Sequence, residues 1–202
     1  MLRVYPADGI DTGHARRYSP AMLAPSRDYG VGVPFWRANP AVATALVIAA
    51  VGAATIAGAW FFELVLKLRP CPLCLEQRVP YYIGIPLALV VAFAAWRGAP
   101  RALVIGGLIA LSGLMLWGAY LAVFHAGVEW KLWAGPAECS GAATFGPAGG
   151  LLNRLQDVVV VRCDEAAWRF LGISLAGYNA VISVVLAVVA LLGALAARHA
   201  RV

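Results

Sequence analysis

The chain has 202 residues, of which 62% are hydrophobic and 13% are charged. A composition this apolar indicates a membrane protein and excludes an ordinary soluble domain of this length. The net charge of +6 does not indicate a nucleic-acid partner. The 16 Lys and Arg residues are scattered over loops and ends of the chain and do not gather along one face.

The first 39 residues differ from the rest of the chain. They are polar, rich in Gly, Pro and Arg, and contain no apolar run of the kind that a secretory signal requires. So few apolar side chains cannot offset the entropy lost on ordering the segment. We therefore expect residues 1–39 to be a disordered cytoplasmic extension and residues 40–202 to form the membrane domain.

Four long apolar segments follow. At a rise of about 1.5 Å per residue, such segments cross a hydrocarbon core of about 30 Å as helices. The predicted spans are 41–62, 79–96, 102–124 and 170–197. The sequence therefore predicts an all-α fold, a four-transmembrane-helix bundle whose outer loops are 63–78 and 125–169. Within the first span, Ala49, Ala53 and Ala57 are spaced by four, so they form either a close helix contact or simple apolar filler.

Positive charge predicts the orientation of this bundle. Lys and Arg are denser in segments 1–39, 97–101 and 198–202 than in the two outer loops. The positive-inside rule then places both termini in the cytoplasm and both loops outside. In a bacterium this means the inner membrane, with the loops in the oxidising periplasm, where disulfides persist.

All four cysteines lie in the two outer loops. Cys71 and Cys74 form a Cys-x-x-Cys pair in the first loop, and Cys139 and Cys163 lie in the second. A thiolate is the reactive species, and a cysteine near a helix N-terminus with a cation close by forms one readily. We expect Cys74 to be this thiolate, with Arg78 four residues later on the same helical face. Two pairs in one compartment indicate electron transfer between them.

The second loop has a pattern of its own. Apolar residues recur at helical spacing over 151–159, which predicts a short helix lying in the membrane interface. Gly and Pro residues over 136–150 make the approach from Cys139 flexible, whereas Cys163 is tethered near the fourth span. A mobile Cys139 and an anchored Cys163 suit a site that passes electrons from one thiol pair to another. The alternative is a static loop braced by a structural disulfide.

Metal and haem sites fit the pattern less well. Zinc takes four tetrahedral ligands, but Cys139 and Cys163 are too far apart in the sequence to form a second knuckle. Haem would require histidines within the spans, yet His14 and His199 lie in terminal segments and His125 lies at the mouth of the third span. We therefore expect no metal. A histidine at that mouth can donate a hydrogen bond to a molecule bound at the membrane surface.

Three groups of residues resemble the disulfide bond formation protein B (DsbB) family. They are Cys71-Pro72-Leu73-Cys74 with Arg78, the segment from His125 through Glu129 to Cys139-Ser140-Gly141, and Arg162-Cys163-Asp164-Glu165 with Trp168. The order of these motifs and the four spans agree with the family from about residue 40 to the C-terminus.

The resemblance implies a membrane thiol:quinone oxidoreductase. It would reoxidise a periplasmic DsbA-like dithiol carrier and pass the electrons to ubiquinone or menaquinone, supporting disulfide bond formation. By this resemblance Cys139 would take the mixed disulfide with the carrier and Cys163 would be its partner. Cys71 would exchange with Cys163.

The same resemblance implies the residues that meet the quinone. Cys74 would form the adduct or charge-transfer contact, Arg78 would stabilise the thiolate and the quinone oxygen, and His125 would lie near the ring.

Two other classes of function compete with this interpretation. A vitamin-K-epoxide-reductase-like enzyme also has a helical bundle with a Cys-x-x-Cys pair, but in that family the pair lies late in the chain. A non-catalytic membrane scaffold would use its cysteines only to brace the outer loops. Cysteines that turn over with a reduced carrier would exclude the scaffold.

Overall fold

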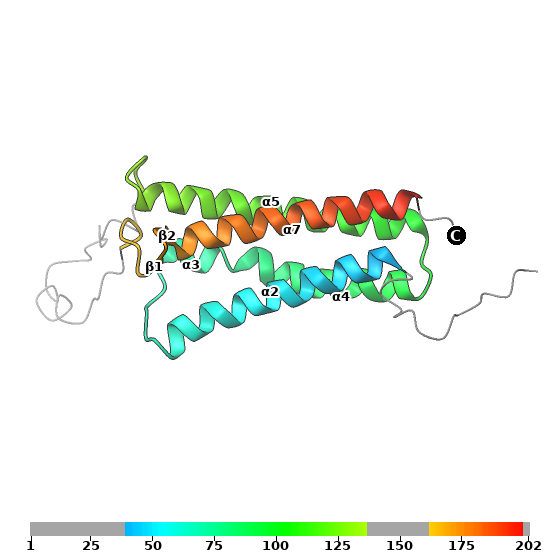
Figure 1. The fold of residues 1–202 in the computed structure, drawn as a ribbon, viewed down its shortest axis with the longest axis horizontal. Coiled ribbons are helices and arrows are strands. Elements are labelled where there is room, and N and C mark those ends of the chain that lie inside the picture. The colour runs from blue at the N-terminus through cyan, green and yellow to red at the C-terminus, as the bar shows by residue number, and fades with distance from the viewer. Residues whose placement is uncertain (1–38, 137–161, 200–202) are drawn as a thin grey trace, which may run out of the picture. The chain divides into compact units, whose positions relative to one another are not determined.

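The computed structural model describes residues 39–136 and 162–199 (Figure 1). Within them the chain forms four helices long and apolar enough to cross a membrane, as the sequence predicts. The expected N-terminal extension up to residue 38, the expected interfacial helix at 151–159 and Cys139 lie outside the described residues.

The long helices are α2 (Pro40–Leu64), α4 (Val79–Trp96), α5 (Arg101–Glu129) and α7 (Leu175–His199). A short helix, α3 (Pro72–Glu76), precedes α4, and a two-stranded antiparallel sheet of β1 (Arg169–Phe170) and β2 (Ile173–Ser174) precedes α7. The most extensive contacts join α5 to α7 and α2 to α4, and contacts of α4 with α5 and of α2 with α7 close the bundle. Figure 1 shows α5 and α7 side by side along their length.

One end of the bundle, here called the Asn39 end, is where α2 and α5 begin and α4 and α7 finish. The Asn39 side chain accepts hydrogen bonds from the backbone N–H groups of Ala41 and Val42 at 3.2 and 3.4 Å, so it caps α2. Its Nδ2 donates to the Ala95 carbonyl at 3.2 Å. Asn39 thus ties the start of α2 to the last turn of α4.

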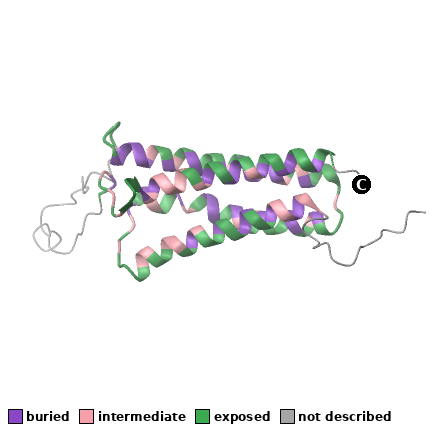
Figure 2. Cartoon of the chain, in the orientation of Figure 1, coloured by how far each residue is buried: buried purple, intermediate pink, exposed green. Residues whose placement is uncertain are grey.

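Small residues set the contact face of α2, but not the ones that the spacing by four suggests. Ala49 is buried, whereas Ala53 and Ala57 are exposed. Four residues make more than one turn of 3.6, so a row spaced by four drifts off the contact face. The face continues through Gly52, where a Cβ would stand 3.2 Å from Ile85 Cγ1 on α4. Exposed residues lie along all four long helices (Figure 2). Many of them are large and apolar, as in lipid-facing helices.

The opposite end, here called the cysteine end, departs from the predicted boundaries. α5 continues to Glu129, so His125 lies inside a helix and not in the second loop. α7 begins only at Leu175, because residues 169–174 form the β1–β2 hairpin. Leu171 and Gly172 have φ angles of 50° and 81°, which is the left-handed pair that a two-residue hairpin turn requires. An apolar run with one glycine does not reveal this turn.

Candidate active site

Cys71 caps the N-terminus of α3. It is the N-cap residue, and its Sγ accepts a hydrogen bond from the backbone N–H of Cys74 at 3.2 Å. Pro72 occupies the first helical position, where the missing N–H costs nothing. The Cys-Pro-x-Cys sequence therefore sets both the helix start and the position of the second thiol. Cys71 is 3% exposed, and Cys74 is half-buried.

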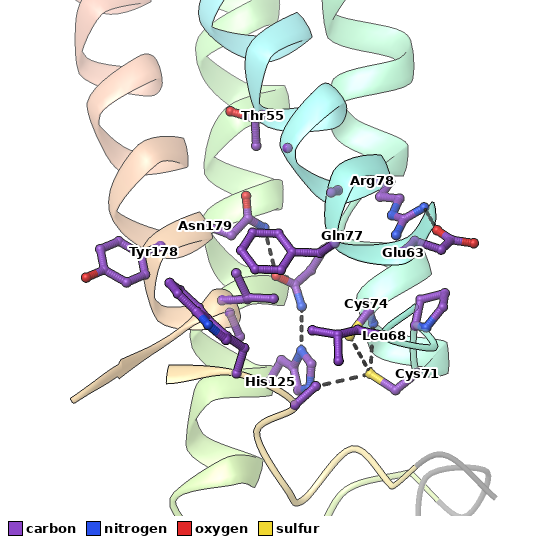
Figure 3. A pocket seen from close by; sticks show the side chains of 18 of the residues that line it. Thr55, Glu63, Leu68, Cys71, Cys74, Gln77, Arg78, His125, Tyr178 and Asn179 are labelled. Carbon is purple, nitrogen blue, oxygen red and sulfur yellow. Dashed lines mark hydrogen bonds and ion pairs between the residues drawn. The ribbon is translucent and has the colours of Figure 1, made fainter. Parts of the chain in front are cut away.

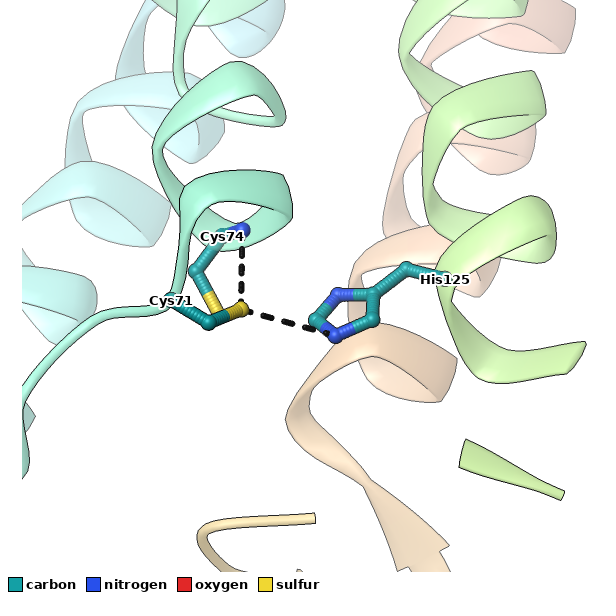
Figure 4. A group of neighbouring side chains, drawn as sticks. All are labelled: Cys71, Cys74 and His125. Carbon is teal, nitrogen blue, oxygen red and sulfur yellow. Dashed lines mark hydrogen bonds between the residues drawn. The ribbon is translucent and has the colours of Figure 1, made fainter. Parts of the chain in front are cut away.

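The two thiols of this pair are free and face each other (Figure 4). Their sulfurs lie 2.6 Å apart, and a disulfide bond needs about 2.05 Å. The hydrogen bond between the two thiols, together with burial, raises the pKa of Cys71. Cys71 therefore keeps its proton and donates it toward the Cys74 sulfur. This arrangement suits a pair that cycles between dithiol and disulfide.

His125 of α5 lies against the cysteine pair. Its Nε2 is 3.6 Å from Cys71 Sγ (Figure 4). Its Nδ1 is 2.6 Å from Nε2 of Gln77 (Figure 3). The sequence places His125 at the mouth of a span and, by the family resemblance, near the quinone, but it does not predict the contacts with Cys71 and Gln77. The ring is also within hydrogen-bond reach of the Cys163 backbone, so it joins the two cysteine-bearing segments.

Behind His125 a chain of polar side chains runs into the bundle. The amide of Gln77 donates to the Leu73 carbonyl at 3.3 Å, and its Oε1 accepts from Asn179 Nδ2 at 2.7 Å. The Tyr81 hydroxyl donates to Asn179 Oδ1 at 2.7 Å and lies 2.9 Å from Ser183 Oγ. Sequence reasoning missed this network. Its signal is the polar residues that interrupt apolar helices, since such residues face the bundle interior and pair with one another.

Arg78 has a partner that the sequence does not predict. α3 ends at Glu76 and Arg78 caps α4, so the helix that would carry Cys74 and Arg78 on one face is broken between them. The Arg78 guanidinium forms an ion pair with Glu63 of α2 at 2.7 Å, and its side chain is only 12% exposed. Arg78 and Cys74 nevertheless line the same cavity.

A cavity of about 300 Å³ opens beside the pair (Figure 3). Its wall combines apolar side chains, including Ile56, Phe62, Trp168 and Ile182, with polar ones, including Cys74, Arg78, His125 and Glu129. The rings of Phe62 and Trp168 lie 5.1 Å apart between centroids. An apolar lining with a few converging polar groups is typical of a small-molecule site, and this volume is at the lower end of the usual range.

Cys163 lies in the same buried cluster as Cys71, Leu73 and Val128. It is fully buried and disulfide-bonded. Cys139 lies outside the described residues. The structure therefore brings three of the four expected cysteines into one region, although Cys71 and Cys163 belong to different loops.

Charged residues hold the Cys163 segment at its surface. The Asp164 carboxylate pairs with Arg162 at 2.8 Å and with Lys131, two residues beyond the end of α5. Hydrogen bonds from Arg162 and then Lys131 hold the pKa of Asp164 well below its usual range. Arg162 also pairs with Glu165 at 3.2 Å.

Cys71, Cys74 and His125 also place three possible metal-ligand atoms within 4.8 Å of one another. Two sulfurs bound to one tetrahedral zinc, each at about 2.3 Å, stand about 3.8 Å apart. The sulfurs here are 2.6 Å apart. The geometry suits a bond between the sulfurs better than shared ligation of an ion.

Comparisons with known proteins show the family of the chain. The family model described as Disulfide bond formation protein DsbB matches residues 41–193. The chain belongs to the DsbB family. Two relatives named Disulfide bond formation protein B are similar to it. The one from Albidiferax ferrireducens is 29% identical over 132 residues, covering 60% of this chain and 69% of the relative. The one from Methylococcus capsulatus is 30% identical over 128 residues, covering 61% and 75%.

An uncharacterized protein of Rickettsia prowazekii is 26% identical over 145 residues, covering 70% of this chain and 80% of the relative. No solved structure matches the chain. As a member of the DsbB family, the chain is a membrane protein of disulfide bond formation, and its homologues indicate an oxidoreductase role.

Proposed function

We propose that this DsbB-family protein reoxidises a periplasmic DsbA-like dithiol carrier and passes the electrons to a membrane quinone. The main support is the position of the free Cys71–Cys74 pair, which lies on the wall of a largely apolar cavity at one end of four membrane-length helices. Reactive sulfur and an apolar cavity at this position are what electron transfer from thiols to a lipid-soluble acceptor requires.

The route begins at the second pair. A carrier thiolate attacks a Cys139–Cys163 disulfide at Cys139, and the carrier's second thiol then resolves the mixed disulfide and leaves as disulfide. The two electrons now reside on the thiols of Cys139 and Cys163. Exchange through Cys71 and Cys163 moves them to the first pair. The shared buried cluster of Cys71 and Cys163 supports this exchange.

The first pair then delivers the electrons into the cavity. A bound quinone, ubiquinone or menaquinone, supplies an acceptor for two electrons and two protons. Cys74 reacts, because its sulfur receives the Cys71 hydrogen bond and borders the cavity. The Arg78 guanidinium, held by Glu63, supplies positive charge to an oxygen that gains electrons. His125 fixes the position of Cys71.

The density of positive charge supports an orientation for this route. With both termini in the cytoplasm of a bacterial inner membrane, the cysteine end faces the periplasm, where a carrier can reach the second loop.

The test is purified protein with a reduced DsbA-like carrier and either ubiquinone or menaquinone. We expect quinone reduction in a 1:1 ratio with carrier oxidation, followed by absorbance. A carrier with one cysteine should become trapped as a covalent complex with the wild type but not with Cys139→Ser. Carrier oxidation without quinone reduction would refute the quinone step. A complex that survives Cys139→Ser would refute the entry point.

A further inference from the structure

The buried carboxyl group of Glu129 has no role in the route above. Glu129 is the last residue of α5, is 7% exposed and lines the cavity. Among the described residues, its Oε2 is the one buried side-chain oxygen or nitrogen without a hydrogen-bond partner. A buried carboxylate oxygen left unpaired costs free energy, and an ionisable group in a membrane-spanning helix generally has a functional partner.

The surroundings of Glu129 come from several elements. Its Oε1 lies 3.8 Å from His125 Nε2, one turn earlier on α5. The Ser174 hydroxyl of β2 is in hydrogen-bond reach, and the Arg169 guanidinium of β1 and the Cys74 sulfur of α3 act on it through their charge. With these groups around it, Oε2 still has no hydrogen-bond partner and is left for a proton or a ligand.

The hydrogen bonds of Gln77 decide what His125 can do. The Gln77 amide nitrogen only donates, to the Leu73 carbonyl and to His125 Nδ1. Nδ1 is therefore an acceptor, and the ring proton of neutral His125 is on Nε2. This N–H can donate to Cys71 Sγ at 3.6 Å, and the Cys163 backbone is also within hydrogen-bond reach of the ring. Glu129 Oε1, at 3.8 Å, is near but beyond hydrogen-bond distance. His125 thus has no lone pair free to take the Cys71 proton.

We propose that Glu129 is the proton carrier of this site: its carboxylate takes up the proton that leaves Cys71 and returns it to the oxygen of the bound acceptor. The inference rests on the proposed transfer to a quinone. Cys71 and Glu129 both line the cavity, and its volume of about 300 Å³ leaves room for a water that links sulfur to carboxylate.

The step balances. Oxidation of the pair breaks two S–H bonds and forms one S–S bond, and the quinone gains two electrons and two protons. The Cys74 proton leaves first to water, which makes the thiolate, and an equivalent proton returns from water to one quinone oxygen. The Cys71 proton passes to Glu129 as the S–S bond closes and then to the other oxygen. Glu129 ends each cycle as it began.

The decisive variant is Glu129→Gln, which keeps one side-chain oxygen but cannot take up a proton. The first readout needs no quinone: an infrared difference spectrum between the dithiol and disulfide states of the first pair. We expect a protonated-carboxyl band to appear on oxidation of the wild type, to shift in D₂O and to be absent in Glu129→Gln. The matched control is Glu76→Gln, an exposed residue on α3, which should keep the band.

The second readout is quinone reduction, which should fall about 100-fold in Glu129→Gln, the low end of the general acid–base contribution. If that variant does not fold, Glu129→Ala with added formate should recover at least about tenfold in rate, because a small acid can occupy the vacated space. An unchanged band or rate in Glu129→Gln, or no rescue by formate, would refute the proton carrier. A wild type that shows the band but does not reduce quinone would refute the proposed function instead.

Discussion

The Asn39 end and the cysteine end use the same four helices, yet they bury different side chains. Toward the Asn39 end, Ala45 and Ala190 are completely buried, as expected of helices in close contact. At the cysteine end the buried residues include Gln77, His125 and Glu129. Small apolar residues let helix backbones approach, whereas polar residues require partners and leave room between helices. One end therefore holds the bundle together, and the other contains the cavity.

Glycines show how tightly the Asn39 end is packed. A Cβ at Gly193 of α7 would stand 2.5 Å from Thr44 Cγ2 of α2, and one at Gly107 would stand 2.5 Å from Val91 Cγ2. No real Cβ tolerates such contacts without a shift of its neighbour. We therefore expect changes at the cysteine end to slow quinone reduction, whether or not they lower stability, and changes at the Asn39 end to lower stability without slowing the reaction.

The largest effect should come from Cys74→Ser. A hydroxyl fits the half-buried position, so we expect a melting temperature in detergent within about 2 °C of the wild type, as for a near-isosteric change. Quinone reduction should fall to the uncatalysed background, because a serine cannot form the disulfide. Absorbance of the quinone with reduced carrier measures this. Any sustained turnover would exclude the first pair as the donor of electrons.

The next prediction concerns one polar side chain at each end of the bundle, Gln77 and Asn39. Gln77→Leu removes the donor to His125 Nδ1 and the acceptor for Asn179, so we expect a loss of about 1–2 kcal/mol in stability. Quinone reduction should slow about tenfold, because His125 is no longer held beside Cys71.

The matched variant is Asn39→Ala, which removes the cap of α2 and should cost about 1 kcal/mol. Its rate of quinone reduction should equal that of the wild type. If both variants slowed the reaction equally, the two ends would not be functionally distinct.

Gly193→Ala should affect stability alone. The added methyl group forces α2 and α7 apart at Thr44, so we expect a loss of about 1–3 kcal/mol. At Gly106, where an added Cβ meets nothing within 4 Å, alanine should be neutral or slightly stabilising. Denaturation in mixed micelles measures both. Equal stabilities of the two variants would contradict the close contact.

The smallest effect should come from Asp164→Asn. The carboxylate holds the Cys163 segment through exposed ion pairs, so we expect carrier-driven reduction of the first pair to slow only about twofold. The difference should shrink at high salt, because ions screen such pairs. Stopped-flow mixing with the carrier measures it. A loss greater than tenfold would mean that Asp164 has a direct part in exchange.

The pH dependence of that contact has a definite sign. The folded state lowers the pKa of Asp164, so its ion pairs are present above the unfolded pKa of about 3.9. The contribution of these ion pairs to the stability of the fold is lost as the pH falls through the pKa of Asp164 in the folded state. The difference in the free energy of unfolding between wild type and Asp164→Asn should therefore stay constant from pH 8 to pH 5 and decline only in stronger acid.

The sequence correctly predicts the elements that depend on the composition of one continuous segment. Uncharged runs predict all four long helices, because a bilayer admits apolar segments of that length. The predicted limits fail where local pattern is ambiguous. Residues 170–174 are as apolar as a helix, yet they belong to the β1–β2 hairpin, and α7 begins only at Leu175. Residues 125–129 include His125 and Glu129, which look like a loop until their burial within α5 is known.

The sequence by itself determined the membrane class, the family motifs and the start of α3, since Cys71 and Pro72 supply the cap and the first helical position. Only the tertiary structure decided that His125 meets Cys71, that Arg78 pairs with Glu63 and that Glu129 lines the cavity. Spacing along a chain fixes contacts within a few helical turns. Contacts between helices depend on their rotation and relative height, which the packing of small residues on α2, α4, α5 and α7 sets.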